Sequence, residues 1–299
     1  MISSAGTGTE CVAAVDVGGT TMKGGLVGRD GTVLYDERRP TPQSGVINAI
    51  SRFVGDLARP RDGLVPRAVG LAVPGLVTPT HAVFSAAFGW RDVPVASFTD
   101  VDLPVALGHD VRSAGEAELA YGVGGDDVLF LPIGTGIAGA VVLSGGLNGG
   151  LYGGADGWAG QIGHIPVWPE GLACRCGQRG CLAAYSSGGA VAARCGSPSA
   201  ADVVRRVAEG DPPAVQVWDE AVEALALALA TYTLLLDPAT VVIGGGVSLA
   251  GDTLLVPLRE RLGARLAFRR PPDVVASGLG IRAGLLGAGL LGWRAVPAG

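Results

Sequence analysis

Three glycine-containing turns, each directly after an apolar run, constrain the fold of this 299-residue chain more than any other feature. Residues 11–17 lead into Gly18-Gly19-Thr20-Thr21, residues 128–133 into Gly134-Thr135-Gly136, and residues 241–243 into Gly244-Gly245-Gly246. Short apolar runs that end in glycine are typical of buried strands in α/β proteins. Glycine lets backbone N–H groups approach a phosphate closely, so the three turns together indicate a nucleotide that lies across a cleft.

The predicted elements form two similar sets. The first set comprises strand 11–17, a hairpin (24–27 and 32–35), helix 46–57, strands 68–73 and 105–107, and helix 113–121. The second comprises strands 128–133, 137–143 and 241–243 and helices 200–209, 214–236, 254–266 and 281–291, with glycine-rich loops over 144–160. Two similar α/β lobes with a cleft between them are the simplest architecture.

Composition excludes several classes of protein. Hydrophobic residues make up 48% of the chain and charged residues 16%, which supports a folded core. A net charge of −5 offers no basic surface for nucleic acid or an anionic membrane. The apolar stretch 221–236 contains Glu223 and reads as a buried helix. The polar start MISSAGTGTE and an odd number of cysteines favour a cytoplasmic protein.

The first glycine turn carries side chains suited to a phosphate and its metal ion. Thr20 and Thr21 add hydroxyl donors, and Lys23 is a point charge that can reach a phosphate. Asp16 at the strand end can hold Mg²⁺ through water. An ordinary hairpin turn remains the alternative for this stretch taken alone, because paired glycines are common.

A compact group of metal-ligand residues follows in the second half. His164, Cys174, Cys176 and Cys181 are four of the chain's eight cysteines and histidines. Thiolates and an imidazole at this spacing suit a tetrahedral Cys3His zinc site. Four protein ligands would make the metal structural, and it would fix an otherwise irregular loop.

The dipeptide His109-Asp110 lies between a short predicted strand and a predicted helix. A carboxylate there can accept the proton of a hydroxyl that attacks a phosphoryl group. From this local pattern alone, Asp110 is better read as the N-cap of the helix.

Eight motifs, in order along nearly the whole chain, resemble the ROK family of sugar kinases and repressors. They are DVGGTTMKG (16–24), VPGLV (73–77), GWRDVP (89–94), HDVRSAGEAE (109–118), PIGTGIAGA (132–140), GQIGH (160–164), CRCGQRGC (174–181) and IGGGVS (243–248). The combination of GQIGH with CRCGQRGC is the most specific part of the resemblance.

The resemblance implies a two-lobed, actin-like and hexokinase-like ATPase fold with ribonuclease H-like lobes and an inserted zinc loop. The smaller lobe would comprise residues 1–115 and about 285–299, and the larger one 116–284. ATP, Mg²⁺ and a structural Zn²⁺ are the implied cofactors, and a homodimer is the implied assembly. Asp110 would be the catalytic base for a sugar 6-hydroxyl, Gly75 a substrate contact, and His164 would bind zinc through one ring nitrogen and sugar through the other.

Three positions depart from the pattern of family glucokinases. Those enzymes usually carry asparagine, glutamate and glutamate where this chain has His109, Gln161 and Ala183, and there the three side chains bind sugar hydroxyls. We therefore expect retained phosphoryl transfer with a changed sugar pocket, suited to glucose or to a glucose-like amino sugar or C7 cyclitol. A non-catalytic sugar sensor is the alternative. A DNA-binding repressor is disfavoured, because only fifteen residues precede Asp16.

Overall fold

The computed structural model describes residues 8–85, 87–143 and 150–297. It divides into two compact units, one formed by Met1–Ala117 with Arg282–Gly299 and the other by Glu118–Ile281. The polar start of the chain up to residue 7, and the part of the predicted glycine-rich loops at 144–149, lie outside the described residues.

The first unit is built on a five-stranded sheet in the order β3-β2-β1-β4-β8. Its strands are β1 (Thr9–Val17), β2 (Thr21–Val27), β3 (Val33–Pro40), β4 (Leu64–Val73) and β8 (Val105–His109). The first three form an antiparallel meander, and β4 and β8 continue the sheet in parallel with β1. The predicted strand at 11–17 is therefore buried on both faces in the middle of the sheet.

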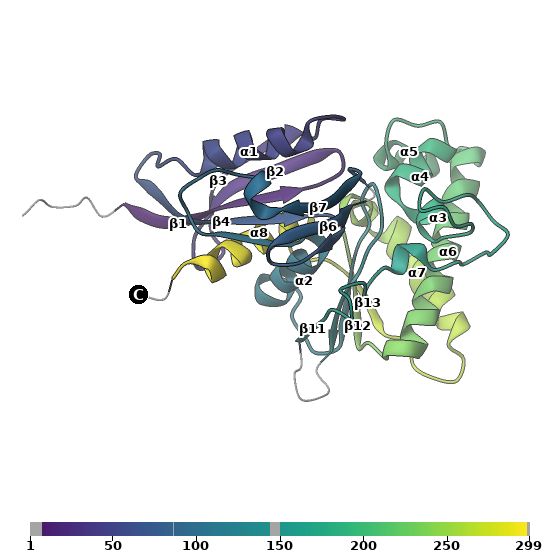
Figure 1. The fold of residues 1–299 in the computed structure, drawn as a ribbon. Helices are drawn as coiled ribbons and strands as arrows, with labels where there is room; N and C mark the ends of the chain where they lie inside the picture. The colour runs from purple at the N-terminus through teal and green to yellow at the C-terminus, as the bar shows by residue number, and fades with distance from the viewer. Residues whose placement is uncertain (1–7, 86, 144–149, 298–299) are drawn as a thin grey trace, which may run out of the picture. The chain divides into compact units, whose positions relative to one another are not determined.

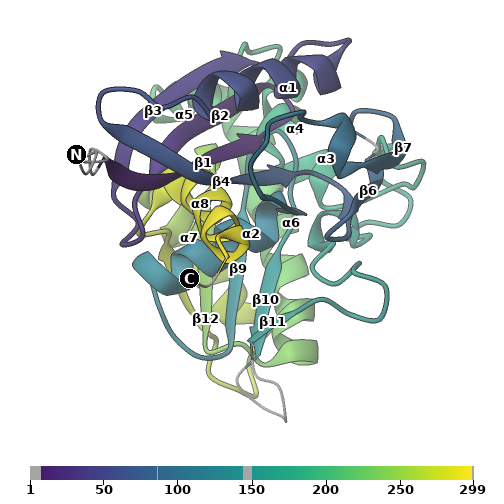
Figure 2. The ribbon, with the colours of Figure 1, turned by 60° about the vertical axis from the view of Figure 1, so that its left-hand side comes forward.

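Two helices cover the opposite faces of this sheet. On one face, Ile50 and Phe53 of α1 (Val46–Leu57) pack in one hydrophobic cluster with Val15 of β1. On the other face lies α8 (Ala283–Ala295), whose Gly292 contacts Val12 of β1 so closely that an added Cβ would lie 2.9 Å from Val12 Cβ. Figure 2 shows the strands between these two helices. The last helix of the chain thus completes the core of the first unit.

A small three-stranded antiparallel sheet follows β4. It consists of β5 (Leu76–Val77), β6 (His81–Ser85) and β7 (Trp90–Pro94). Trp90 is buried here, with ring centroids 4.6 Å from Phe88 and 5.1 Å from Phe98. This side chain belongs to the core of the first unit.

The second unit repeats the topology of the first. Its sheet has the order β11-β10-β9-β12-β13, with an antiparallel meander followed by two parallel strands. The strands are β9 (Val128–Pro132), β10 (Ala140–Leu143), β11 (Gly150–Tyr152), β12 (Thr240–Gly244) and β13 (Asp273–Ala276). The two similar sets of strands expected from the sequence are confirmed, but the helix expected over 281–291 belongs to the first unit and not to the second set.

The second unit also contains helices and, between β11 and the first of them, a long irregular stretch that includes three of the cysteines. The helices are α3 (Ala183–Ser186), α4 (Gly188–Arg194), α5 (Ala200–Ala208), α6 (Pro212–Leu236) and α7 (Asp252–Arg265), while α2 (Asp110–Tyr121) runs from the first unit into the second. The middle of α6, residues 221–230, is mostly buried, as its apolar sequence predicts, whereas Leu234 and Leu235 in its last turn are exposed. Among the described residues, none of the helices combines the length and apolarity needed to cross a bilayer.

Several local expectations were wrong. The strand expected at 137–143 begins only at Ala140, because Gly139 N–H donates to Gly160 O (2.6 Å) instead of joining the ladder with β9. The helix expected from 113 begins at Asp110, and the one expected over 281–291 runs from Ala283 to Ala295. Helices α3 and α4, strands β11 and β13 and the small sheet were not anticipated.

A buried carboxylate near the end of α2 binds the chain segment 277–279, which precedes α8. Glu118, near the end of α2, is 1% exposed. It accepts hydrogen bonds from Ser277 Oγ (2.6 Å), Gly278 N (2.6 Å) and Leu279 N (3.3 Å), and from Val123 N (3.0 Å). The carboxylate thereby fixes the end of α2 to the segment that leads into α8.

We expect Glu118→Gln to lower the free energy of unfolding by about 2–3 kcal/mol, because the amide has only one accepting oxygen for these donors. The matched control is Glu116→Gln on the same helix, whose carboxylate pairs at 2.9 Å with the half-exposed Arg294. That change should cost less than about 1 kcal/mol. Urea denaturation of the two variants compares these values, and equal losses would contradict the role given to Glu118.

Candidate functional site

Asp16 and Lys23 form an ion pair at the first glycine turn. They are directly opposite each other on β1 and β2, and Lys23 Nζ donates to Asp16 Oδ2 at 3.0 Å. Asp16 is 7% exposed, so this carboxylate is held in one position next to a cation. The sequence placed both residues in one candidate site, and the structure brings them together.

The turn between the two strands is closed by its own backbone. Gly18 N–H donates to Thr21 O (3.1 Å), and Thr41 Oγ1 donates to Gly18 O (2.7 Å). Gly19 and Thr20 are exposed at the tip. Thr41, which sequence reasoning missed, has no motif of its own and is brought to the turn only because β3 returns beside β2.

Gly75 and Asp110 lie at the same edge of the first sheet as Asp16. Strands β1, β4 and β8 are parallel, with Asp16 paired to Ala72 and Val73 paired to His109. Gly75 therefore follows the end of β4 and Asp110 the end of β8. The backbone of Gly75 has φ +117° and leaves no room for a Cβ next to Phe84 O, so this position requires glycine.

His109 provides the side-chain cap of α2. Its Nδ1 accepts a hydrogen bond from Arg112 N–H (3.3 Å), three residues on, in the manner of an N-cap side chain. Asp110 Oδ1 accepts from the adjacent Val111 N–H (2.8 Å) and lies 3.3 Å from His109 Nδ1. Asp110 is thus the first residue of the helix, and the local reading of Asp110 as its N-cap was wrong.

Burial shifts the pKa of both side chains. It raises the pKa of Asp110 to about 7, with a further contribution from the negative charge of Asp16. It lowers the pKa of His109 to about 4, and the charge of Arg112 adds to this. At neutral pH the imidazole is uncharged, which agrees with Nδ1 as an acceptor, while the carboxyl group titrates near pH 7.

The other two glycine turns meet within the second unit. Ile133 N–H donates to Gly244 O (2.9 Å), and Val247 N–H donates to Ile133 O (3.0 Å). The Gly134-Thr135-Gly136 turn connects β9 and β10, the position that the Asp16 turn occupies in the first unit. Gly244-Gly245-Gly246 follows β12, as Gly75 follows β4. The structure thus brings these two predicted nucleotide-binding segments side by side.

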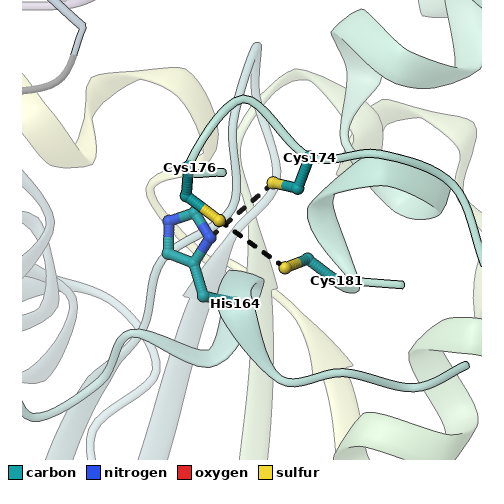
Figure 3. A group of neighbouring side chains, drawn as sticks. All are labelled: His164, Cys174, Cys176 and Cys181. Carbon is teal, nitrogen blue, oxygen red and sulfur yellow. Dashed lines mark hydrogen bonds between the residues drawn. The ribbon is translucent and has the colours of Figure 1, made fainter. Parts of the chain in front are cut away.

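His164 and the three cysteines form one cluster, as predicted (Figure 3). Their ligand atoms all lie within 4.8 Å of one another. Cys176 Sγ is 3.7 Å from Cys181 Sγ, and Cys174 Sγ is 3.9 Å from His164 Nδ1. A tetrahedral zinc site with Zn–S bonds of about 2.3 Å has S···S edges of about 3.8 Å, so the donor set fits zinc in both chemistry and spacing.

Gln161 and Ala183, two positions that depart from the family pattern, lie near the cluster along the chain and through backbone contacts. His164 N–H donates to Gln161 O (3.0 Å), and Leu182 N–H, beside Ala183, donates to Ile165 O (2.9 Å). Since Nδ1 of His164 faces Cys174, Nε2 is the ring nitrogen left for another partner. Burial lowers the pKa of His164, which favours the neutral imidazole that a metal ion binds.

Comparisons with known proteins agree with the motifs. A model of the ROK family matches residues 12–294. The chain is 35% identical to a glucokinase of Thermotoga maritima, over 92% of this chain and 94% of that one. It is also 33% identical to an N-acetylmannosamine kinase of Escherichia fergusonii, over 93% and 97% of the two chains.

A solved structure supports the same assignment. The ROK family glucokinase of Streptomyces griseus, in complex with glucose and AMPPNP, superposes with a TM-score of 0.83 at 30% identity. The alignment covers 95% of this chain and 99% of that one. The expected two-lobed α/β fold is confirmed, and the chain belongs to the ROK family.

Proposed function

We propose that this protein is a sugar kinase that transfers the γ-phosphoryl group of ATP to the hydroxymethyl (6-type) hydroxyl of glucose or a glucose-like substrate. The observation that carries the proposal is the placement of Asp110 at the same sheet edge as the Asp16–Lys23 pair, with a pKa of about 7. The glucokinase and N-acetylmannosamine kinase relatives support this reaction class.

In this proposal Asp110 accepts the proton of the attacking hydroxyl, for which a pKa near neutrality is suitable. The exposed backbone at Gly19 and the ammonium of Lys23 contact phosphate groups, and the turns at 134–136 and 244–246 bind the rest of the nucleotide. Asp16 would hold Mg²⁺ through water, as carboxylates commonly do. The ion would neutralise charge on the phosphates.

The zinc ion would be structural. Bound by His164 Nδ1 and the three thiolates, it would fix the imidazole so that Nε2–H points at a sugar hydroxyl. Gln161 and Ala183, which lie beside His164 in the chain fold, would then line the same part of the sugar pocket.

The substrate we propose differs from glucose near these altered positions. Ala183 cannot accept a hydrogen bond from a hydroxyl, and leaving a buried hydroxyl unpaired costs about 1–3 kcal/mol. At His109, Nδ1 is already occupied by the helix cap, so only Nε2–H is left for a substrate. The Nε2–H of His109 can donate to an acceptor atom of the substrate, at the position where family glucokinases carry an asparagine. Candidate substrates are therefore glucose-like molecules that differ from glucose in this region, such as 3-amino-3-deoxyglucose in its neutral form, whose amine can accept from Nε2–H, or a C7 cyclitol.

The direct test is nucleotide-dependent phosphorylation of a panel of sugars by the purified protein. The panel comprises glucose, mannose, N-acetylmannosamine, glucosamine, 3-amino-3-deoxyglucose and a C7 cyclitol, with Asp110→Asn as the blank. We expect at least one analogue to exceed glucose in kcat/KM, and Asp110→Asn to lose at least about a hundredfold. Preference for glucose would overturn the substrate assignment. No turnover above the blank would favour the non-catalytic sensor.

The pH dependence follows from the pKa of Asp110. A base must be unprotonated, so kcat/KM for the sugar should fall about tenfold per pH unit below pH 7 and level off above it. His109→Asn serves as the control, because an amide oxygen can replace Nδ1 as the helix cap. The kcat/KM of His109→Asn should therefore change with pH around the same midpoint, near pH 7, as that of the wild type. A profile that stays flat down to pH 5 would exclude Asp110 as the base.

Metal analysis tests the zinc site. We expect about one zinc ion per chain in the wild type and in Cys195→Ser, since Cys195 lies outside the cluster. The double variant Cys174→Ser/Cys176→Ser should contain less than about a tenth of this. A chelator should lower the melting temperature of the wild type and of Cys195→Ser, which contain zinc, but not that of the double variant. Equal metal content in all three would contradict the assignment.

A further inference from the structure

The first turn of α8 lies directly against the carboxylate of Asp16. A Cβ added at Gly284 would overlap Asp16 Oδ2 and lie 2.5 Å from Asp16 Cγ. Figure 1 shows α8, in yellow, beneath the strands of the first sheet. The contact joins residues that are 268 positions apart, so no local sequence pattern indicates it.

The Asp16 carboxylate is therefore confined from two directions. Lys23 Nζ holds Oδ2 at 3.0 Å on the β2 side, and the backbone of α8 fills the space next to the same group. Asp16 is 7% exposed, which leaves little room for another rotamer. A methyl group at position 284 would displace the carboxylate, the helix or both.

Another glycine on α8, Gly289, also lies close to the first sheet but does not touch Asp16. A Cβ added at Gly289 would lie 2.9 Å from Val27 Cγ1, at the far end of an aliphatic side chain. Both glycines are buried on one helix and both face the first sheet. An alanine at Gly289 disturbs only the packing of α8 on the sheet, whereas an alanine at Gly284 also disturbs Asp16. Comparing the two variants therefore isolates the effect on Asp16.

We propose that Gly284 is a positioning residue for nucleotide binding: because it has no side chain, α8 holds the Asp16 carboxylate at the distance from Lys23 that the phosphates and their Mg²⁺ require. The inference deepens the proposed function and rests on it. It adds to the active site a residue that touches neither substrate nor nucleotide and acts through Asp16.

The test compares Gly284→Ala with Gly289→Ala in the full chain. Gly284→Ala should reduce kcat/KM for ATP by about a hundredfold, as expected for a misplaced binding group. It should weaken binding of Mg²⁺–AMPPNP, measured by calorimetry, by at least about tenfold. Gly289→Ala, which places its methyl group against Val27, should change either quantity by less than about threefold. Equal effects of the two variants on nucleotide binding would overturn the inference.

A double-mutant cycle with Asp16→Ala provides a second readout. Removal of the carboxylate creates room for the methyl group, so Gly284→Ala should neither weaken Mg²⁺–AMPPNP binding further nor lower the melting temperature in that background. If the single variant fails to fold, the double variant should recover the folded state. Additive losses, or a double variant that also fails to fold, would overturn the inference.

These outcomes are distinct from a failure of the proposed function. A wild type that phosphorylates no sugar on the panel but binds Mg²⁺–AMPPNP, with binding sensitive to Gly284→Ala, would refute the kinase and leave the positioning role intact. A wild type that turns over a sugar, with Gly284→Ala as active as Gly289→Ala, would refute only the positioning role.

Discussion

Close contact between a helix and a sheet backbone is the constraint on which the first unit depends. Gly70, in the centre of β4, lies so near α8 that an added Cβ would be 2.5 Å from Gly292 N. Because glycines on both partners have no side chain, the backbone of the helix directly approaches the backbone of the strand. The same approach places the first turn of α8 against Asp16, and it couples the packing of this unit to the geometry of its candidate site.

The repeated topology explains why the candidate residues gather as they do. In each unit a three-stranded antiparallel meander precedes two parallel strands, and the candidate turns follow corresponding strands. The Asp16 turn in the first unit and the Gly134 turn in the second both connect the first two strands. The chemistry then differs between the two units. Among the described residues, Asp16 and Asp110 follow strands of the first sheet, whereas the Cys3His cluster lies in the second unit.

Much of this arrangement could be predicted from the sequence because it rests on local signals. Buried strands ending in glycine, and ligand residues within eighteen positions, leave patterns that a single segment displays. The small sheet of β5, β6 and β7 leaves none, because its strands have only two to five residues and pair through their backbones. Helices α3 and α4 are equally hidden, since the alanine- and glycine-rich segment 183–194 has little amphipathic period. The His109 cap was missed because histidine is uncommon at that position.

The contribution of α8 to the first unit has a consequence for synthesis. All of residues 118–281 leave the ribosome before α8 does, and they fold into a unit with its own core. Until α8 has been synthesised and has docked, the face of β1, β4 and β8 that it covers lacks this helix. The N-terminal unit is thus the last to be completed, and an interrupted chain would expose an apolar strand surface of the kind that chaperones bind.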